Sequence, residues 1–203
     1  MNSSDVRIYS SSSEKGSSCE IWGVLLDAGA LPRTNLFGRT CLVSHMHGDH
    51  VRKAKDFEYR GCRVLYPGRD FGHKSVMRIG DVLVKAVLLM HDVDCYGFLL
   101  RRGSEYALYA VDTYDIPYRF PKLKWLLLGI DYDEYTLWNS ALNHELPLSL
   151  AERISNSHMS LERAKRFLAR QEYENLVIMH YGQWLNLELA KEETGGLLWT
   201  ELN

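Results

Sequence analysis

The hydrophobic pattern of the chain consists mainly of short apolar runs, with a few stretches of helical spacing between them. Apolar and β-branched runs that end at glycine or charged residues are typical of strands. They predict strands at Val6–Tyr9, Glu20–Asp27, Thr40–Ser44, Arg63–Tyr66, Val82–Met90, Tyr96–Arg101, Tyr106–Val111, Lys124–Ile130 and Leu176–Met179. The serine-rich stretch Ser10–Ser18 is expected to form a loop that closes the first strand.

The clearest helical signal begins after Ser160, whose hydroxyl suits the N-cap because it can accept a hydrogen bond from a free N–H group of the first turn. The apolar positions that follow have a 3.6-residue repeat and are Leu161, Ala164, Phe167 and Leu168. Shorter helices are expected after His50, between Tyr135 and Ile154, and from Gln183 to Lys191. Because strands and helices mix along the whole length, the pattern predicts an α/β or α+β fold with a mostly two-sheet core.

Length and composition fit one globular unit. The chain has 203 residues, of which 46% are hydrophobic, so we expect a single domain over residues 1–203. Its net charge of −2 argues against a protein that coats nucleic acid or an anionic membrane. The start lacks the profile of a secretory signal, and the apolar runs are too short to span a bilayer. We therefore expect a cytoplasmic protein with no membrane partner, and the oligomeric state stays open, a homodimer included.

Several familiar motifs are absent from the sequence. The four cysteines, Cys19, Cys41, Cys62 and Cys95, are widely spaced and include no C-x-x-C pair. This spacing argues against a disulfide framework and a zinc knuckle, and predicts small buried apolar side chains. There is also no G-x-S-x-G elbow, P-loop or dinucleotide fingerprint. No motif therefore indicates catalysis through an acyl-serine intermediate or a reaction driven by nucleotide hydrolysis.

The segment Ser44–His50, which reads S-H-M-H-G-D-H, carries the strongest chemical signal. It follows a predicted strand, in which alternate side chains share a face, so His45 and His47 can point the same way. The glycine lets the chain turn, and Asp49 and His50 can then reach a neighbouring point. Imidazoles and a carboxylate suit Zn, Mn or Fe, and the arrangement suits two ions side by side. The alternative, a merely polar loop, requires this pattern to arise by chance.

The pattern H-x-H-x-D-H, preceded by L-L-D-A-G at Leu25–Gly29, resembles the signature of the metallo-β-lactamase superfamily. The resemblance covers most of the chain. A serine-rich turn ending at Cys19, a distal histidine, a D-T pair after a strand and a terminal strand ending in histidine follow in the family's order. The resemblance implies a four-layer αββα sandwich, with the ligands on loops at one edge of the two sheets.

The resemblance also implies two divalent metal ions, with zinc expected and manganese or iron as alternatives. The residues similar to the family's first metal site are His45, His47 and His91. Those similar to the second are Asp49, His50 and His180, with Asp112 as the bridge between the two ions. Asp92 and Asp94 are competing carboxylates beside His91, and we prefer the histidine.

His158 stands two residues before Ser160, where the free N–H groups and the dipole of a helix favour an anion. The segment S-H-M-S-L-E-R-A resembles the place where the nuclease-like branch carries a histidine that protonates the leaving group or binds phosphate. We therefore expect His158 and Ser160 to bind substrate, and Asp49 and His158 to be catalytic. The alternative is that His158 merely caps the helix. The remaining histidines, His73 and His144, belong to no motif and are expected to be ordinary surface groups.

Two metal ions about 3.5 to 4 Å apart lower the pKa of a shared water, which predicts attack by a bridging hydroxide without a covalent enzyme intermediate. The serine-rich turn, the His158 segment and a basic flank favour a phosphodiester substrate. The flank holds four acidic residues and nine basic ones, which are Arg52, Lys53, Lys55, Arg60, Arg63, Arg69, Lys74, Arg78 and Lys85. Such a flank suits a phosphate-bearing substrate, although a charge run is usually a solvated face.

The sequence therefore predicts a metal-dependent phosphodiesterase or nuclease, similar to short bacterial and phage members of the superfamily, acting on nucleic acid or a small nucleotide, cyclic ones included. The alternatives are a hydrolase of a non-phosphate ester, thioester or lactam, and a catalytically silent metal-stabilised binding protein. Two departures from the nuclease branch stand out. Its glutamate after the bridging aspartate is missing, with Asp131 as a candidate replacement in the proton relay. The long insertion that grips the tRNA elbow is also absent, so we do not expect a tRNA substrate.

Overall fold

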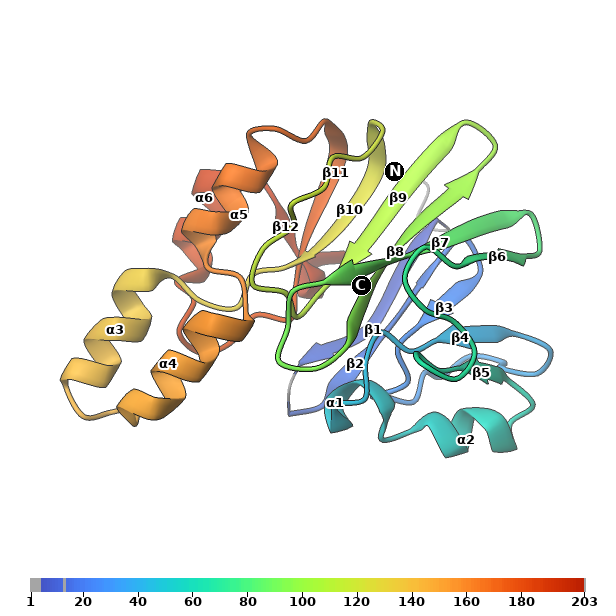
Figure 1. The fold of residues 1–203 in the computed structure, drawn as a ribbon, viewed down its shortest axis with the longest axis horizontal. Coiled ribbons are helices and arrows are strands. Elements are labelled where there is room, and N and C mark those ends of the chain that lie inside the picture. Colours follow the sequence, from blue (N-terminus) through green and yellow to red (C-terminus); the bar gives the residue numbers. More distant parts are fainter. Residues whose placement is uncertain (1–4, 13, 203) are drawn as a thin grey trace.

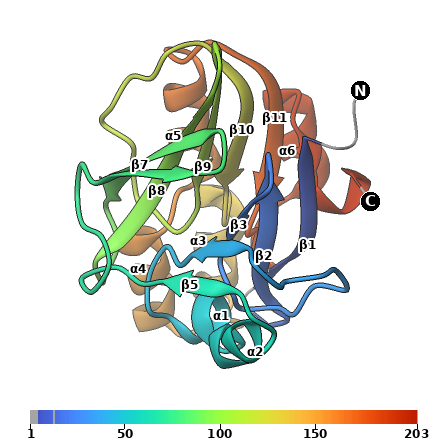
Figure 2. The same ribbon diagram turned by 90° about the vertical axis from the view of Figure 1, so that its right-hand side faces the viewer.

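Two mixed β-sheets pack face to face in the computed structural model, which describes residues 5–12 and 14–202 (Figures 1 and 2). The first sheet has the order β1-β2-β3-β4-β5 and consists of β1 (Val6–Ser12), β2 (Gly16–Ile21), β3 (Val24–Leu26), β4 (Thr40–Leu42) and β5 (Arg63–Leu65). The second has the order β12-β11-β10-β9-β8-β7-β6 and consists of β6 (Val76–Ile79), β7 (Val82–Leu89), β8 (Cys95–Arg102), β9 (Glu105–Ala110), β10 (Leu123–Gly129), β11 (Tyr173–Met179) and β12 (Leu197–Leu198).

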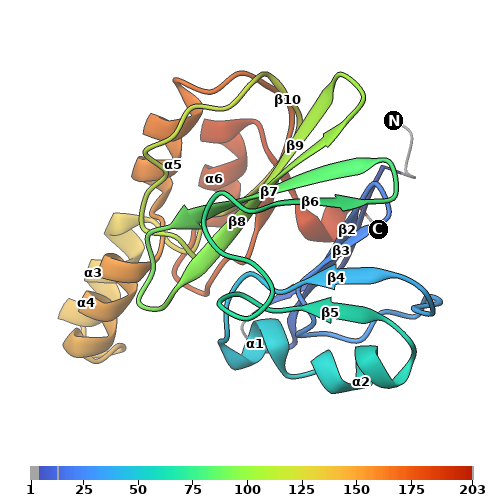
Figure 3. The same cartoon turned by 45° about the vertical axis from the view of Figure 1, so that its right-hand side comes forward.

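Helices cover the outer faces of both sheets (Figure 3). The helices α1 (Gly48–Val51) and α2 (Ala54–Tyr59) lie on the first sheet, and α5 (Leu161–Leu168) and α6 (Leu187–Thr194) on the second. The chain also forms α3 (Glu134–Leu142), α4 (Leu148–Ser157) and the 3-10 helix η1 (Trp199–Leu202). Ile21 and Phe98 belong to the core between the sheets. Phe57 of α2 packs on the outer face of the first sheet, and Phe167 of α5 on that of the second. These layers confirm the αββα sandwich.

The pair α3 and α4 forms a hairpin that projects beyond the sheets (Figure 1). Its own small apolar cluster includes Leu137 of α3, Ala151 of α4 and Tyr132 of the preceding segment. The end of α4 returns to the body of the protein at Ser157, directly before His158. The hairpin therefore delivers His158 to the edge of the sheets where the other predicted site residues lie.

Strands form at all the predicted positions, but Glu20–Asp27 contains a hairpin instead of one strand. β2 ends at Ile21 and β3 begins at Val24, and the chain reverses at Trp22 and Gly23, whose φ angles are 50° and 84°. The apolar pattern hid this turn because tryptophan is not a typical turn residue. β6 and β12 were not predicted, because β6 alternates between exposed and half-buried positions and β12 has only two residues. Helices form in all the predicted regions.

The expectation of a serine-rich loop at Ser10–Ser18 is wrong. Ser10 and Ser11 continue β1 and pair with Ser18 and Ser17 of β2, and all four side chains are buried. Ser13 lies outside the described residues. Serine is frequent in turns, but here these serines pair between two strands, and their small side chains are buried against the rest of the protein. The hydroxyl of Ser11 accepts a hydrogen bond from the backbone N–H of His180 at 2.8 Å, so this segment helps to position a candidate ligand.

All four cysteines are buried and free of disulfide bonds, as their spacing predicted. Burial raises the pKa of Cys19, Cys41 and Cys95 well above the ordinary value of a thiol, so these groups stay uncharged. Among the described residues, no helix combines the length and the apolar character needed to cross a membrane.

Candidate metal centre and its cavities

The seven predicted ligands gather at one edge of the sandwich, in two groups. The first group consists of His45, His47 and His91. The second consists of Asp49, His50, Asp112 and His180. Within each group the potential ligand atoms all lie within 4.8 Å of one another. The rings of His45 and His50, one from each group, have centroids 4.2 Å apart, so the two groups adjoin.

Each ligand follows the end of a strand or opens a helix. His45 and His47 follow β4, and the short helix α1 carries Asp49 and His50. The other three follow strands of the second sheet, His91 after β7, Asp112 after β9 and His180 after β11. The two sheets thus contribute ligands to one common cluster.

Three buried residues of this region have backbones in the left-handed region, which is uncommon for residues other than glycine. The φ angles are 61° at Asp27, 48° at Asp112 and 45° at His180. Such conformations cost about 1 to 3 kcal/mol each and persist only where the surroundings enforce them, most often at functional sites. They turn the chain sharply at strand ends and so direct these side chains into the cluster.

Gly29, which ends the L-L-D-A-G motif, permits a close approach of two loops. A Cβ atom at this position would lie 1.6 Å from the backbone oxygen of Asp49. The backbone N–H of Gly29 donates to the carbonyl of Ser17, and that of Ala28 to the carbonyl of His50. The motif is therefore the support on which the loop with Asp49 and His50 rests.

Neighbouring groups orient the imidazole rings. Asp27 Oδ2 lies 2.7 Å from His50 Nδ1, and the same carboxylate accepts hydrogen bonds from the backbone N–H and hydroxyl of Ser44 and from the Tyr109 hydroxyl. His91 Nδ1 lies 2.9 Å from the carbonyl oxygen of Ser157, which suits donation from the ring. Partners of this kind fix which nitrogen faces a metal. The sequence analysis quoted Asp27 within a motif but gave it no role.

The cluster contains buried polar atoms without a well-aligned hydrogen bond. They are Nε2 of His45, Nε2 of His50 and Oδ1 of Asp112. Two of these atoms do have an ion-pair partner, since His50 Nε2 lies 2.9 Å from Asp112 Oδ2 and Asp112 Oδ1 lies 2.8 Å from His180 Nδ1. The nearest carboxylate oxygen to His45 Nε2 is Asp112 Oδ2, at 3.4 Å. Unsatisfied buried polar groups are rare because they are costly. Metal ions would satisfy them, and a donor set of imidazoles and carboxylates suits zinc and similar ions. The residues present therefore fit metal binding.

Without metal, the candidate ligands pair with one another. Burial lowers the pKa of His50 and His180, but the neighbouring carboxylates raise both well above the ordinary value, so these two rings must lose a proton to bind a metal ion. Burial lowers the pKa of His45 to about 3, so this imidazole is neutral, as a ligand must be. Burial alone would raise the pKa of Asp49. Hydrogen bonds with His180 and His50 have the opposite and larger effect, so the pKa lies well below its ordinary value. Burial likewise raises the pKa of Asp112, and the same two histidines bring it far down. Both carboxylates are therefore ionised.

No family model and no curated protein matches the sequence, but solved structures match the fold. YhfI from Bacillus subtilis, a metallo-β-lactamase fold protein, is 13% identical and superposes with a TM-score of 0.68 over 95% of this chain and 94% of its own. Zinc-bound PqqB from Methylobacterium extorquens is 11% identical, with a TM-score of 0.66 over 95% of this chain and 96% of its own. A diphosphatase of the PhnP family is 15% identical, with a TM-score of 0.63 over 95% of this chain and 93% of its own.

The chain has the metallo-β-lactamase fold. Its two sheets and outer helices are those of this fold, and its histidine-aspartate cluster lies where strands of both sheets end.

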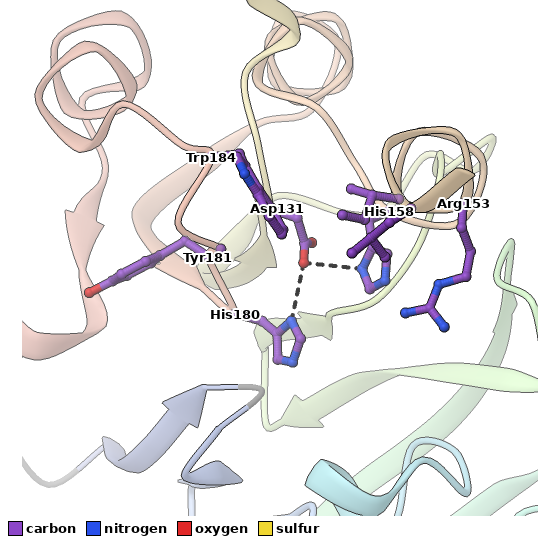
Figure 4. Close-up of a pocket in the computed structure, with 9 residues that line it drawn as sticks. Asp131, Arg153, His158, His180, Tyr181 and Trp184 are labelled. Carbon is purple, nitrogen blue, oxygen red and sulfur yellow. Dashed lines mark hydrogen bonds and ion pairs between the residues drawn. The ribbon is translucent and has the colours of Figure 1, made fainter. Parts of the chain in front are cut away.

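In this metallo-β-lactamase fold His158 adjoins the second group of ligands. His158 Nδ1 lies 3.1 Å from Asp131 Oδ1 and 3.8 Å from Asp112 Oδ1, and Asp131 also lies 3.3 Å from His180 Nδ1 (Figure 4). Burial lowers the pKa of His158, but Asp131 and then Asp112 raise it to about 8. The structure thus brings Asp131, the candidate replacement for the missing glutamate, into contact with His158.

Ser160 has a structural role at the start of α5. Its hydroxyl accepts a hydrogen bond from the backbone N–H of Arg163 at 3.2 Å, which confirms the predicted N-cap of α5. The side chain is fully buried and lines neither of the cavities described below, so the structure gives no support to a substrate contact. Because Ser160 is the N-cap of α5, the alternative in which the His158 side chain merely caps this helix is wrong. The substrate contact of Ser160 stays a prediction.

Two cavities flank the candidate metal centre. The first, of about 270 Å³, lies between α4 and the segment after β11 and is lined by Asp131, Leu150, Arg153, Ile154, His158, His180, Tyr181, Gly182 and Trp184 (Figure 4). The second, of about 550 Å³, is lined by Leu88, Leu89, Met90, His91, Asp92, Val93, Asp94, Tyr114 and Asn156. The sequence analysis missed Arg153 and Trp184, because neither residue belongs to a motif.

The remaining predicted residues lie apart from the two groups or at their margin. Asp92 Oδ1 is 3.1 Å from His91 Nε2, so this carboxylate borders the first group. His73 accepts a hydrogen bond from the backbone N–H of Leu88, and His144 lies in the turn of the projecting hairpin. None of the nine basic residues of segment 51–85 lines either cavity. The basic flank is therefore not part of the walls of the candidate site.

Proposed function

We propose that this protein is a metal-dependent phosphodiesterase. The observation that carries the proposal is the His158–Asp131 pair, 3.1 Å apart, beside the second group of ligands. A protonated imidazole there gives the site a positively charged proton donor, which suits an anionic substrate with a poor leaving group. The fold neighbour described as a PhnP-family diphosphatase supports phosphate chemistry.

Two divalent ions would be held by the two groups of side chains. The first would bind His45, His47 and His91 and the second Asp49, His50, Asp112 and His180, with Asp112 as the bridge. Zinc is the first candidate, because imidazole donors suit it and the PqqB neighbour is zinc-bound. When bound, such ions supply Lewis acidity and a water of lowered pKa.

Asp49 and His158 would have separate roles in proton transfer. The contacts of Asp49 with His50 and His180 both use Oδ2, which leaves Oδ1 to accept a hydrogen bond from the attacking water. His158 would donate its proton to the oxygen of the leaving group, and Asp131 would hold its ring in position. An in-line displacement would require the attacking water beside Asp49 and the leaving oxygen beside His158 to lie on opposite sides of the phosphate.

Hydrolysis of bis(p-nitrophenyl) phosphate by the zinc-loaded protein tests this function. We expect turnover that falls at least about 100-fold in His47→Ala and Asp49→Ala, because each loses a ligand. His73→Ala is the matched control, since His73 lies outside the cluster, and it should retain the activity. Equal rates in all four proteins would refute metal catalysis. Faster turnover of a thioester or a lactam than of any phosphodiester would refute the substrate class.

A further inference from the structure

The smaller cavity, between α4 and the segment after β11, has the position and size of a pocket for one part of a small substrate. Its inner end is formed by His158 and His180, so a group placed in it is adjacent to the candidate metal centre. Its volume of about 270 Å³ is just below the usual range for the complete site of a small molecule, which begins at about 300 Å³. This space holds a single ring system and is too small for successive units of a polymer.

The walls of this cavity are suited to a flat apolar group. Leu150 and Ile154 of α4 form part of one wall, and the half-buried indole of Trp184 comes from the opposite segment. Figure 4 shows the Tyr181 ring turned away from His158, which leaves Trp184 as the aromatic side chain beside the cavity. Aromatic rings stack favourably on indole, and nucleobases do so with little dependence on their identity.

Arg153 adds a positive charge to this cavity. It is exposed on α4, and its guanidinium makes no ion pair with any residue in the described part of the chain. It is also the one lysine or arginine that lines either cavity. Guanidinium groups bind phosphate oxygens with well-directed hydrogen bonds. Arg153 is therefore available for an anionic group attached to the ring.

The surroundings do not provide a path for a nucleic acid strand. A strand is held by a row of lysine and arginine side chains along its backbone. The larger cavity instead contributes Asp92 and Asp94, and the nine basic residues of segment 51–85 lie outside both cavities. The charge pattern thus favours a substrate with few phosphates.

We propose that the cavity beside His158 binds an aromatic ring of the substrate on Trp184, and that the substrates are small nucleotidyl or aryl phosphodiesters. This proposal rests on the proposed function and narrows it. It assigns recognition of the ring to Trp184 and recognition of an attached phosphate to Arg153, neither of which belongs to the ligand groups.

Calorimetric binding of two phosphate monoesters to the zinc-loaded protein tests the cavity without turnover. Adenosine 5′-monophosphate carries a ring and methyl phosphate does not. We expect the first to bind at least about tenfold more tightly, and Trp184→Leu to abolish this preference without changing the affinity for methyl phosphate. Trp184→Phe should retain most of the preference. Arg153→Gln should lower the affinities for both phosphate monoesters by the same factor, so that the ratio of the two affinities stays unchanged.

Trp138→Leu is the matched control, because Trp138 packs in the same hairpin cluster as Trp184 but does not line the cavity. It should keep the full preference. Equal affinities for the two ligands in the wild type, or an unchanged preference in Trp184→Leu, would overturn the proposal even if phosphodiesters are hydrolysed. A retained preference without any phosphodiester turnover would instead support the cavity and refute the proposed function. A single-stranded DNA cleaved with higher kcat/KM than thymidine 5′-(p-nitrophenyl phosphate) would also overturn the proposal.

Discussion

Asp27 orients the second group of ligands without belonging to it. Its carboxylate lies 2.7 Å from His50 Nδ1 and accepts the Tyr109 hydroxyl at 2.6 Å and the Ser44 N–H at 2.7 Å. All of these groups are buried, so no water can replace a lost partner. A single side chain thus fixes which nitrogen of His50 faces the cluster.

We expect Asp27→Asn to lower zinc affinity by roughly 10- to 100-fold, the usual cost of losing a carboxylate behind a ligating histidine. The amide presents an N–H₂ group where the site supplies donors, so the ring of His50 loses its fixed orientation. Competition with a chromophoric chelator measures the affinity. Asp81→Asn, at an exposed position, is the control. Equal zinc affinities in the two variants would contradict a role for Asp27 in positioning His50.

Loss of the His158 side chain should lower kcat most on substrates whose leaving group must be protonated as it departs. In His158→Ala we expect kcat to fall roughly 100-fold on a substrate with an alkoxide leaving group, and only a few fold on one that releases p-nitrophenol. Asp131→Asn should give the same pattern more weakly, because Asp131 acts through the ring of His158. His144→Ala, in the hairpin turn, is the control. An equal loss on both substrates would contradict proton donation.

Sequence analysis named the residues that the structure gathers into the two groups, but not the residues that support them, for a physical reason. His45, His47 and Asp49 share one short motif, whose spacing already limits where their side chains can point. Asp27 and Trp184 reach the site only through the packing of distant segments. Asp27 stands in the L-L-D-A-G motif, but the motif does not show which side chain it contacts, and Trp184 belongs to no motif. For Ser160, the local sequence correctly predicted a helix cap, whereas the substrate contact stays a prediction.

At the scale of elements, the loop with Asp49 and His50 depends on close contact with the end of β3. Gly29→Ala places a methyl group 1.6 Å from the backbone oxygen of Asp49, so the loop must move. We expect a loss of about 1 to 3 kcal/mol in the free energy of unfolding, as for other overpacked sites, together with weaker zinc binding. Chemical denaturation of the metal-free protein measures the first effect separately from the second.

Gly72→Ala is the matched control for this prediction. A Cβ atom at Gly72 meets no other atom within 4 Å, and its backbone is not in the left-handed region. This variant should therefore keep both its stability and its zinc affinity. If Gly29→Ala were as stable as Gly72→Ala, the loop with Asp49 would not depend on its close contact with the backbone at Gly29.

Elements were predictable where the burial of large apolar side chains left a clear pattern in the sequence. The central strands β8 and β10 of the second sheet are almost continuous apolar runs, because helices and the other sheet cover both faces, and they were predicted from the sequence. The pairing of Ser10–Ser12 with Gly16–Ser18 carries no such pattern, since its buried positions are small and polar. Tertiary packing decides the conformation of that segment.

At the scale of the whole molecule, the candidate centre joins the two sheets. His45, His47, Asp49 and His50 come from the segment after β4 of the first sheet. His91, Asp112 and His180 follow strands of the second sheet. Metal ions held by both sets would link the sheets at one edge, and they would satisfy buried atoms that otherwise lack well-aligned partners.

Removal of metal should therefore destabilise the entire fold and not only the loops of the site. An ion that binds only the native state, and whose free concentration is about 1,000 times its Kd, adds about 4 kcal/mol to the free energy of unfolding. For a domain of this length, each kcal/mol shifts Tm by about 2 to 4 °C, so zinc should raise Tm by roughly 8 to 16 °C over the protein treated with chelator. Scanning calorimetry of both forms measures the shift.

The double variant His47→Ala, His180→Ala, which lacks a ligand in each group, should unfold at the same temperature with and without zinc. If zinc raised its Tm as much as that of the wild type, the ion would be binding elsewhere. Because ligands come from both sheets, the wild type should also lose near-UV and far-UV circular dichroism in one transition in each form. A zinc-dependent transition confined to one probe would mean that the ions stabilise a local segment and do not link the sheets.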